Sequence, residues 1–107
     1  MNILFVCSKN LSRSPTAEMI YKDHDDINVK SAGTEPSAEN KLTAENISWS
    51  DLIFVMEKKH EQTILENFPI ETKQKQIIVL DIGDEYKYMD DELIDKVKAK
   101  VSVYLDK

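Results

Sequence analysis

The feature that most constrains the fold is a set of three short apolar runs, which recur along the chain with amphipathic segments between them. The runs cover residues 3–6, 52–56 and 77–80, and each is rich in β-branched or aromatic side chains. Unbroken apolar runs of this length are typical of strands that are buried on both faces of a parallel sheet. A fourth and weaker candidate, residues 27–31, alternates apolar and polar residues and suits an edge strand.

Helical patterns lie between and after these runs. Ser14 and Pro15 predict the N-cap and first residue of one helix, because proline needs no hydrogen-bond donor there. Residues 36–47, 57–68 and 90–105 are expected to form the others. Alternating strands and helices predict an α/β fold, in which a parallel sheet has right-handed crossovers and helices on both faces. Ligands bind such folds at the carboxyl ends of the strands, and Cys7 ends the first strand.

Composition excludes several classes of protein. A chain of 107 residues predicts a single domain, residues 1–107, and its 14 basic and 20 acidic residues give a net charge of −6. An acidic domain is a poor binder of nucleic acid or anionic membranes, which attract clustered basic charge. One cysteine excludes an intramolecular disulfide and a cysteine-based zinc site, and it suits a reducing compartment. The apolar runs are too short for a signal peptide or a membrane span, so we expect a cytoplasmic protein.

The only cysteine, Cys7, and the only arginine, Arg13, lie six positions apart, on a polar loop between the first strand and the first helix. The loop's amide groups and the helix N-terminus can bind an anion, and the planar guanidinium of Arg13 matches two phosphate oxygens. The same positive surroundings favour a nucleophilic thiolate at Cys7, which Ser14 can stabilise by a hydrogen bond. We therefore predict phosphoryl transfer through a cysteinyl-phosphate, without metal or cofactor. The phosphate-binding residues would be Ser8, Lys9, Asn10, Leu11, Ser12 and Arg13.

A simpler interpretation makes Cys7 a small buried hydrophobic residue and Arg13 a solvated residue at a helix start. That interpretation leaves the apolar strand before the loop and the Ser-Pro pair after it unexplained.

Residues 7–15 resemble the phosphate-binding loop of the low-molecular-weight protein tyrosine phosphatases, in which Cys, five residues, Arg, Ser and usually Pro follow one another. Further matches are Asn10 and residues 31–34, 51–56 and 81–86. The resemblance spans nearly the whole chain. It implies a three-layer sandwich with a four-stranded parallel sheet of order 2-1-3-4, and a phosphate-binding loop after strand 1. It also implies a monomer that acts on a phosphotyrosine-containing protein or a small aryl phosphate and releases inorganic phosphate.

The resemblance also implies roles for individual residues. Cys7 would be the nucleophile and Arg13 the phosphate clamp, while Asn10 would hold the loop through Ser31. Farther down the chain, Asp84 would be the general acid, with Asp81 as the main alternative. Tyr86 would help to line the cleft.

The chain departs from the family pattern in three places. Residues 35–50 replace a longer stretch that supplies a cleft wall and a loop-bracing histidine, so we expect structural roles for His24 and His60 and packing for Trp49. Lys9 stands where the family usually has glycine and would be strained if that position required a positive φ. Ser12 replaces a second loop cysteine, which excludes a protective disulfide.

Other functions remain open. Arsenate reductases with this loop need further cysteines, which this chain lacks, unless a small thiol or a partner resolves the adduct. Phosphoarginine phosphatases also resemble this family, but their loops tend to carry Thr where Leu11 stands, which favours phosphotyrosine. A non-catalytic phosphate-binding module would need neither Cys7 nor Asp84.

Overall fold

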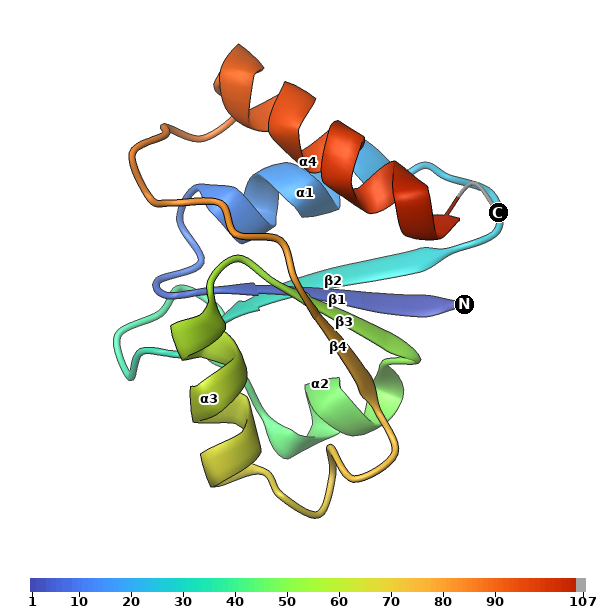
Figure 1. The fold of residues 1–107 in the computed structure, drawn as a ribbon, viewed down its shortest axis with the longest axis vertical. Coiled ribbons are helices and arrows are strands. Elements are labelled where there is room, and N and C mark those ends of the chain that lie inside the picture. Colours follow the sequence, from blue (N-terminus) through green and yellow to red (C-terminus); the bar gives the residue numbers. More distant parts are fainter. Residues whose placement is uncertain (106–107) are drawn as a thin grey trace.

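The computed structural model describes residues 1–105, and its strands and helices alternate along the chain (Figure 1). The elements are β1 (Asn2–Cys7), α1 (Arg13–Tyr21), β2 (Asn28–Gly33), α2 (Ala44–Trp49), β3 (Leu52–Val55), α3 (Lys58–Asn67), β4 (Gln76–Val79) and α4 (Asp91–Leu105). All strand pairs are parallel, and the sheet has the order β2-β1-β3-β4. The predicted α/β fold with strand order 2-1-3-4 is confirmed.

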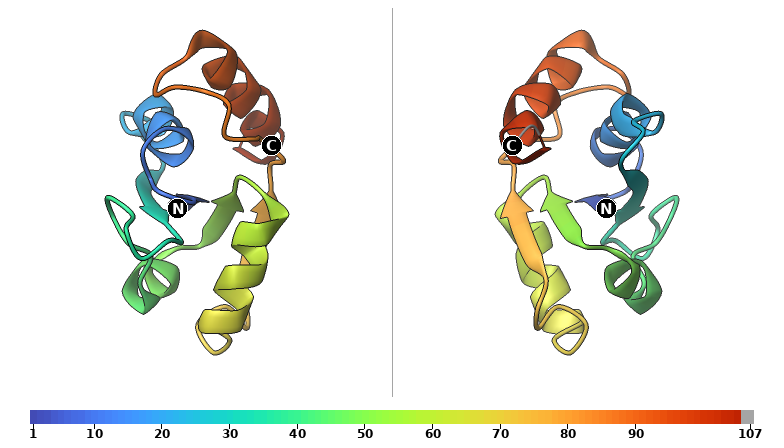
Figure 2. Two further views of the ribbon diagram at one scale, coloured as in Figure 1. Left: turned by 90° about the vertical axis from the view of Figure 1, so that its left-hand side faces the viewer. Right: turned by 90° about the vertical axis from the view of Figure 1, so that its right-hand side faces the viewer.

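The sheet is the middle of three layers, with α1 and α4 on one face and α2 and α3 on the other (Figures 1 and 2). Successive strand residues point to opposite faces, so Phe5 packs on the side of α1 and α4 while Leu4 and Val6 pack on the side of α2 and α3. Both sets of side chains are fully buried. The apolar runs are unbroken because each strand contributes to two cores at once.

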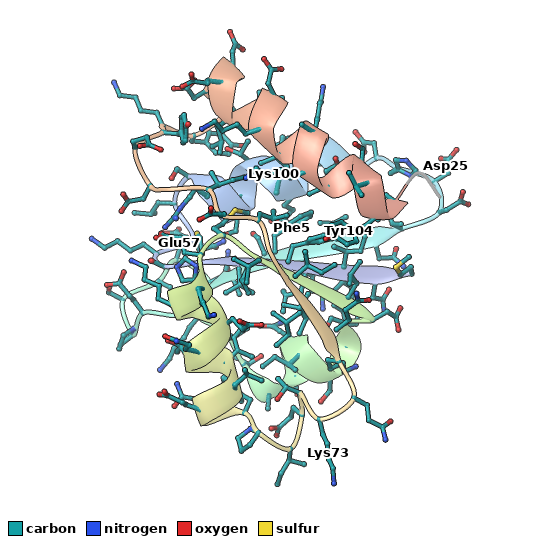
Figure 3. The ribbon with its side chains drawn as sticks, in the orientation of Figure 1. Phe5, Asp25, Glu57, Lys73, Lys100 and Tyr104 are labelled. Carbon is teal, nitrogen blue, oxygen red and sulfur yellow. The ribbon has the colours of Figure 1, made fainter. Side chains whose placement is uncertain are left out.

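Aromatic rings fill the core beneath α4. Phe5 stacks on Phe54 at 5.3 Å between ring centroids, and Tyr104 of α4 meets Phe54 edge-on at 5.7 Å. Figure 3 shows Phe5 and Tyr104 between the sheet and α4. Aromatic pairs in these geometries stabilise a core beyond the area that they bury.

Two helices differ from the prediction by more than one residue at their start. The first helix begins at Arg13 after the N-cap Ser12, not at Pro15 after Ser14, because the Ser14 hydroxyl bonds side chains of the preceding loop. The second helix covers only Ala44–Trp49, where residues 36–47 were expected. Thr43 fixes its start by a reciprocal pair of hydrogen bonds with Asn46, so residues 36–43 form an irregular segment.

Within the described residues, no helix combines the length and the apolar character that crossing a membrane requires.

Candidate active site

A pocket of about 250 Å³ opens where β1 ends, at the carboxyl edge of the sheet. Its lining residues are Cys7, Ser8, Lys9, Leu11, Ser12, Arg13, Glu35, Lys59 and Asp84. Figure 2 (left) faces the corresponding edge of the fold. The pocket therefore gathers all the predicted phosphate-binding residues except Asn10, together with one carboxylate from the segment after β4.

The segment after β2 holds the loop in place by donating hydrogen bonds to the carbonyl groups of the loop. The amides of Thr34, Glu35 and Glu39 donate to the carbonyl oxygens of Cys7, Ser8 and Lys9 at 2.9–3.0 Å. No hydrogen bond from the backbone N–H groups of residues 8–12 to another residue occurs in the described part of the chain. With their carbonyls turned to one side, successive amides form a concave donor surface of the kind that binds phosphate.

Gly33 makes this close approach possible. A Cβ atom on Gly33 would lie 2.6 Å from the Ser8 carbonyl oxygen and 2.6 Å from the Ala38 Cβ. Both distances are shorter than any real contact of this kind, and one neighbour is backbone. The glycine of the Ser-Ala-Gly-Thr motif is thus required by the packing of the loop against residues 34–38.

Asn10 braces the loop from beneath the pocket. Its side chain, 2% exposed, donates to Ser14 Oγ at 2.8 Å and to Ser31 Oγ at 3.0 Å, so the expected contact with Ser31 is present. Its Oδ1 accepts from Asn40 Nδ2 at 2.8 Å. Asn10 has a φ of 58°, a conformation that asparagine tolerates better than most residues. Lys9 does not have a positive φ, so the strain considered for Lys9 does not arise.

Cys7 lies at the floor of the pocket and is 2% exposed. Its Sγ lies 2.9 Å from Ser14 Oγ, which also accepts the hydrogen bond from Asn10. The Ser14 hydroxyl has two acceptors in reach for its own proton, the Ala32 carbonyl oxygen at 3.4 Å and the nearer Cys7 sulfur. When the proton points to the sulfur, Ser14 donates a hydrogen bond to it. That arrangement stabilises a thiolate, the nucleophilic form of cysteine.

Arg13 is buried at the start of α1 and is fixed by two acceptors. Its Nη1 donates to Glu57 Oε2 at 2.5 Å and to the Ile82 carbonyl oxygen at 2.8 Å. The Arg13 hydrogen bond is the main cause that lowers the pKa of Glu57 below its usual value. Both recorded bonds use Nη1, so Nη2 and Nε remain available for two phosphoryl oxygens. Figure 3 shows Glu57 where β3 leads into α3.

His60 braces the start of the loop, at Ser8. Its Nε2 lies 2.8 Å from Ser8 Oγ, and its Nδ1 accepts from the Glu57 amide at 3.0 Å. The pKa of His60 is lowered to about 4, mainly by burial and secondly by the nearby Arg13 charge. His60 was expected to be structural and unrelated to the loop-bracing histidine. The structure corrects this prediction, because α3 brings His60 directly to the loop.

The two candidate acids occupy different places. Asp84 lines the pocket with Cys7, whereas Asp81 does not. Asp81 has a φ of 58°, and Lys100 from α4 donates to the carbonyls of Leu80 and Asp81. These contacts direct the chain from β4 across the sheet edge and bring Asp84 to the pocket.

The prediction for Tyr86 is wrong. Tyr86 does not line the pocket but is buried in the core on the side of α4, and the Lys96 ammonium lies 5.2 Å from its ring centroid. Trp49 lies at the opposite edge of the sheet, where its carbonyl accepts from the Asn2 side chain. The Lys30 ammonium lies over the ring of Trp49, 4.4 Å from its centroid. Trp49 is therefore a packing residue and not part of a cleft wall.

Comparison with known proteins agrees with this geometry. The model of the family described as low molecular weight phosphotyrosine protein phosphatase matches residues 2–48, which include β1, the loop, α1 and β2. The tyrosine phosphatase amsI of Erwinia amylovora is 25% identical and superimposes with a TM-score of 0.77, over 98% of this chain and 91% of that structure. The chain is therefore similar to the low molecular weight phosphotyrosine protein phosphatases, in sequence over residues 2–48 and in fold over nearly its whole length.

Two further matches, one to a solved structure and one to a sequence, come from Bacillus subtilis. A YwlE mutant superimposes with a TM-score of 0.73 at 25% identity, over 100% of this chain and 99% of that structure. A protein-arginine-phosphatase of strain 168 is 30% identical, and the match covers 64% of this chain but only 63% of that relative's length. The proteins that this chain resembles thus carry names that give different substrates.

Sequence reasoning missed four residues of this site: Glu35, Glu57, Lys59 and His60. Glu57 had a usable signal, because it follows the buried run 52–56 directly and so falls at the same sheet edge as Cys7. His60 stands one helical turn farther on, on the same side. Glu35 and Lys59 carry no comparable pattern and reach the pocket only through the folded arrangement.

Proposed function

We propose that this protein hydrolyses phosphate monoesters through a cysteinyl-phosphate intermediate, with phosphotyrosine as its substrate. The observation that carries the proposal is one pocket that holds Cys7, Arg13 and Asp84 around a loop, residues 8–12, whose amides have no hydrogen-bond partner among residues 1–105. A nucleophile, an anion clamp and an acid within one site are what a two-step phosphoryl transfer needs.

In the first step, phosphoryl oxygens accept hydrogen bonds from the loop amides and from Arg13. The Cys7 thiolate forms a bond to phosphorus while the bond between phosphorus and the phenolic oxygen breaks. Asp84, protonated at this stage, gives its proton to the departing oxygen, so the alcohol leaves neutral.

In the second step, the Asp84 carboxylate takes a proton from water, and the water oxygen forms a bond to phosphorus. The bond between sulfur and phosphorus breaks, which releases inorganic phosphate and returns the thiolate to its hydrogen bond with Ser14. Arg13 and the amides neutralise the charge of the phosphoryl group in both steps.

Leu11 supports phosphotyrosine as the substrate. Its side chain lines the pocket and is 58% exposed, so it offers apolar surface to the ring of an aryl phosphate. Burying that surface against a ring is favourable, whereas the guanidinium of phosphoarginine gains little from it.

Phosphoarginine is the second candidate. Besides the 30% identity to a protein-arginine-phosphatase, two carboxylates line the pocket, Glu35 and Asp84, and either can attract the guanidinium of that substrate. Both candidates imply a phosphorylated protein as partner. A reducing compartment such as the cytoplasm suits the free thiol of Cys7.

The test compares kcat/KM for matched phosphotyrosyl and phosphoarginyl peptides, with Cys7→Ser as the control for contaminating phosphatases. We expect hydrolysis of the phosphotyrosyl peptide to exceed that of the other by about tenfold or more, and we expect no turnover by Cys7→Ser. A preference for phosphoarginine would replace the substrate but keep the mechanism. Unchanged turnover by Cys7→Ser would contradict the mechanism itself.

A further inference from the structure

A chain of hydrogen bonds with a fixed direction runs from the start of α3 into the pocket. It begins at the backbone amide of Glu57, which donates to His60 Nδ1 at 3.0 Å. A backbone amide can only donate, so Nδ1 must be the unprotonated nitrogen of the ring. The neutral imidazole then carries its proton on Nε2.

The next bond follows from that tautomer. His60 Nε2 lies 2.8 Å from Ser8 Oγ, and with the proton on Nε2 the histidine donates and the serine oxygen accepts. The pKa of His60, lowered to about 4 by burial and by the Arg13 charge, keeps the ring neutral at ordinary pH. His60 is 1% exposed, so water does not compete for either nitrogen.

The Ser8 hydroxyl is thereby left with a proton of its own to donate. Its oxygen already accepts from His60, and in the described part of the chain the hydroxyl has no other hydrogen-bond partner. Ser8 lines the same pocket as Cys7 and Arg13, so a phosphoryl oxygen is the acceptor that the site itself would supply. A hydroxyl that accepts one hydrogen bond becomes a stronger donor in the next.

We propose that Ser8 Oγ donates a hydrogen bond to an oxygen of the bound phosphoryl group, and that His60 is the positioning residue that fixes the direction of this donor. The inference deepens the proposed function and rests on it. It adds a side-chain donor to the amides and to Arg13, at the end of the loop opposite to the arginine.

The first experiment measures inorganic phosphate binding by ³¹P NMR titration, which needs no turnover. Ser8→Ala should weaken phosphate binding by about 10- to 100-fold, the range for a hydrogen bond to a charged group. Ser8→Thr keeps a hydroxyl and should restore most of the affinity. Equal phosphate affinity in Ser8→Ala and the unmodified protein would overturn the proposal.

The variant His60→Asn distinguishes the role of the Ser8 hydroxyl as a donor from the role of His60 in holding the loop. In α2, Asn46 Oδ1 accepts from the amide of the N-cap residue Thr43 at 3.2 Å, so asparagine at the third helical position can keep the bond to the Glu57 amide. The shorter side chain does not reach Ser8, yet the Ser8 hydroxyl remains. We expect His60→Asn to weaken phosphate binding less than Ser8→Ala. Equal losses in the two variants would mean that the pair only holds the loop, and would overturn the proposal.

The second experiment observes the tautomer directly in the unmodified protein. The ¹⁵N shifts of His60 should report a protonated Nε2 and an unprotonated Nδ1, with the exposed His24 as the internal reference. A protonated Nδ1 would contradict the inferred direction. Phosphate binding and tautomer do not depend on turnover, so loss of activity in Cys7→Ser tests the proposed function separately from this inference.

Discussion

Asp84 and Asp81 are close in sequence, but only Asp84 shares the pocket with Cys7. We expect Asp84→Asn to lower kcat by about 10²- to 10⁴-fold, the range for a general acid. The loss should be larger with phenyl phosphate than with p-nitrophenyl phosphate, because the better leaving group needs less protonation.

Asp81→Asn is the matched control for Asp84→Asn. Asparagine tolerates the φ of 58° at residue 81, so this variant should fold and keep its activity. If Asp81→Asn is inactive and Asp84→Asn is not, the acid is Asp81.

The lowered pKa of His60 gives the protein a defined pH dependence of stability. Between about pH 4 and 6.5 the unfolded chain binds a proton at residue 60 that the folded chain does not, so the free energy of unfolding rises with pH across this window. The full difference is at most about 3 kcal/mol. Urea unfolding of His60→Asn should lose this part of the pH slope.

His24→Asn is the control for that experiment, because His24 is the other histidine of the chain and is exposed. If His60→Asn and the unmodified protein have the same slope between pH 4 and 6.5, the environment assigned to His60 is wrong.

At the scale of the elements, the end of β2 determines the shape of the loop after β1. Gly33→Ala forces a Cβ to within 2.6 Å of the Ser8 carbonyl oxygen, so residues 34–38 must move away from the loop. We expect phosphate affinity and kcat/KM to fall by about tenfold or more, and the protein to lose about 1–3 kcal/mol of stability. Phosphatase assay and urea unfolding measure the two effects.

Gly83→Ala provides the comparison for Gly33→Ala. The nearest atoms to a Cβ at Gly83 belong to the flexible side chain of Glu85, the closest at 3.1 Å, and that side chain can turn aside. This variant should keep its fold and its phosphate affinity. An active Gly33→Ala protein would show that the contact with residues 34–38 does not shape the loop.

At the scale of the whole molecule, the sequence predicts what is local and periodic. The strands follow from unbroken apolar runs, and the loop follows from the spacing of Cys7 and Arg13. The bonds from Arg13 to Glu57 and from Ser8 to His60 join residues 44 and 52 positions apart, which no local pattern reveals. Tyr86 was misplaced for a similar reason, because its burial depends on how α4 packs.

The single cysteine also predicts how the molecule responds to oxidation. With no second cysteine in the chain, a sulfenic acid on Cys7 cannot be protected by an intramolecular disulfide. Strong peroxide treatment should therefore inactivate the protein irreversibly, whereas dithiothreitol should recover only protein stopped at the sulfenate. Residual activity and the mass of the peptide carrying Cys7 measure the two stages. Full recovery after strong oxidation would contradict this prediction.

The most direct test of the account is to trap the phosphoryl group during turnover. The protein is mixed with excess p-nitrophenyl phosphate, quenched in acid within the first turnovers, digested and examined by mass spectrometry. In the unmodified protein we predict one phosphoryl group on Cys7. In Cys7→Ser we predict no phosphoryl group that forms and is released during turnover. Steady hydrolysis with the label on another residue, or undiminished hydrolysis by Cys7→Ser, would contradict the central claim that Cys7 is the nucleophile.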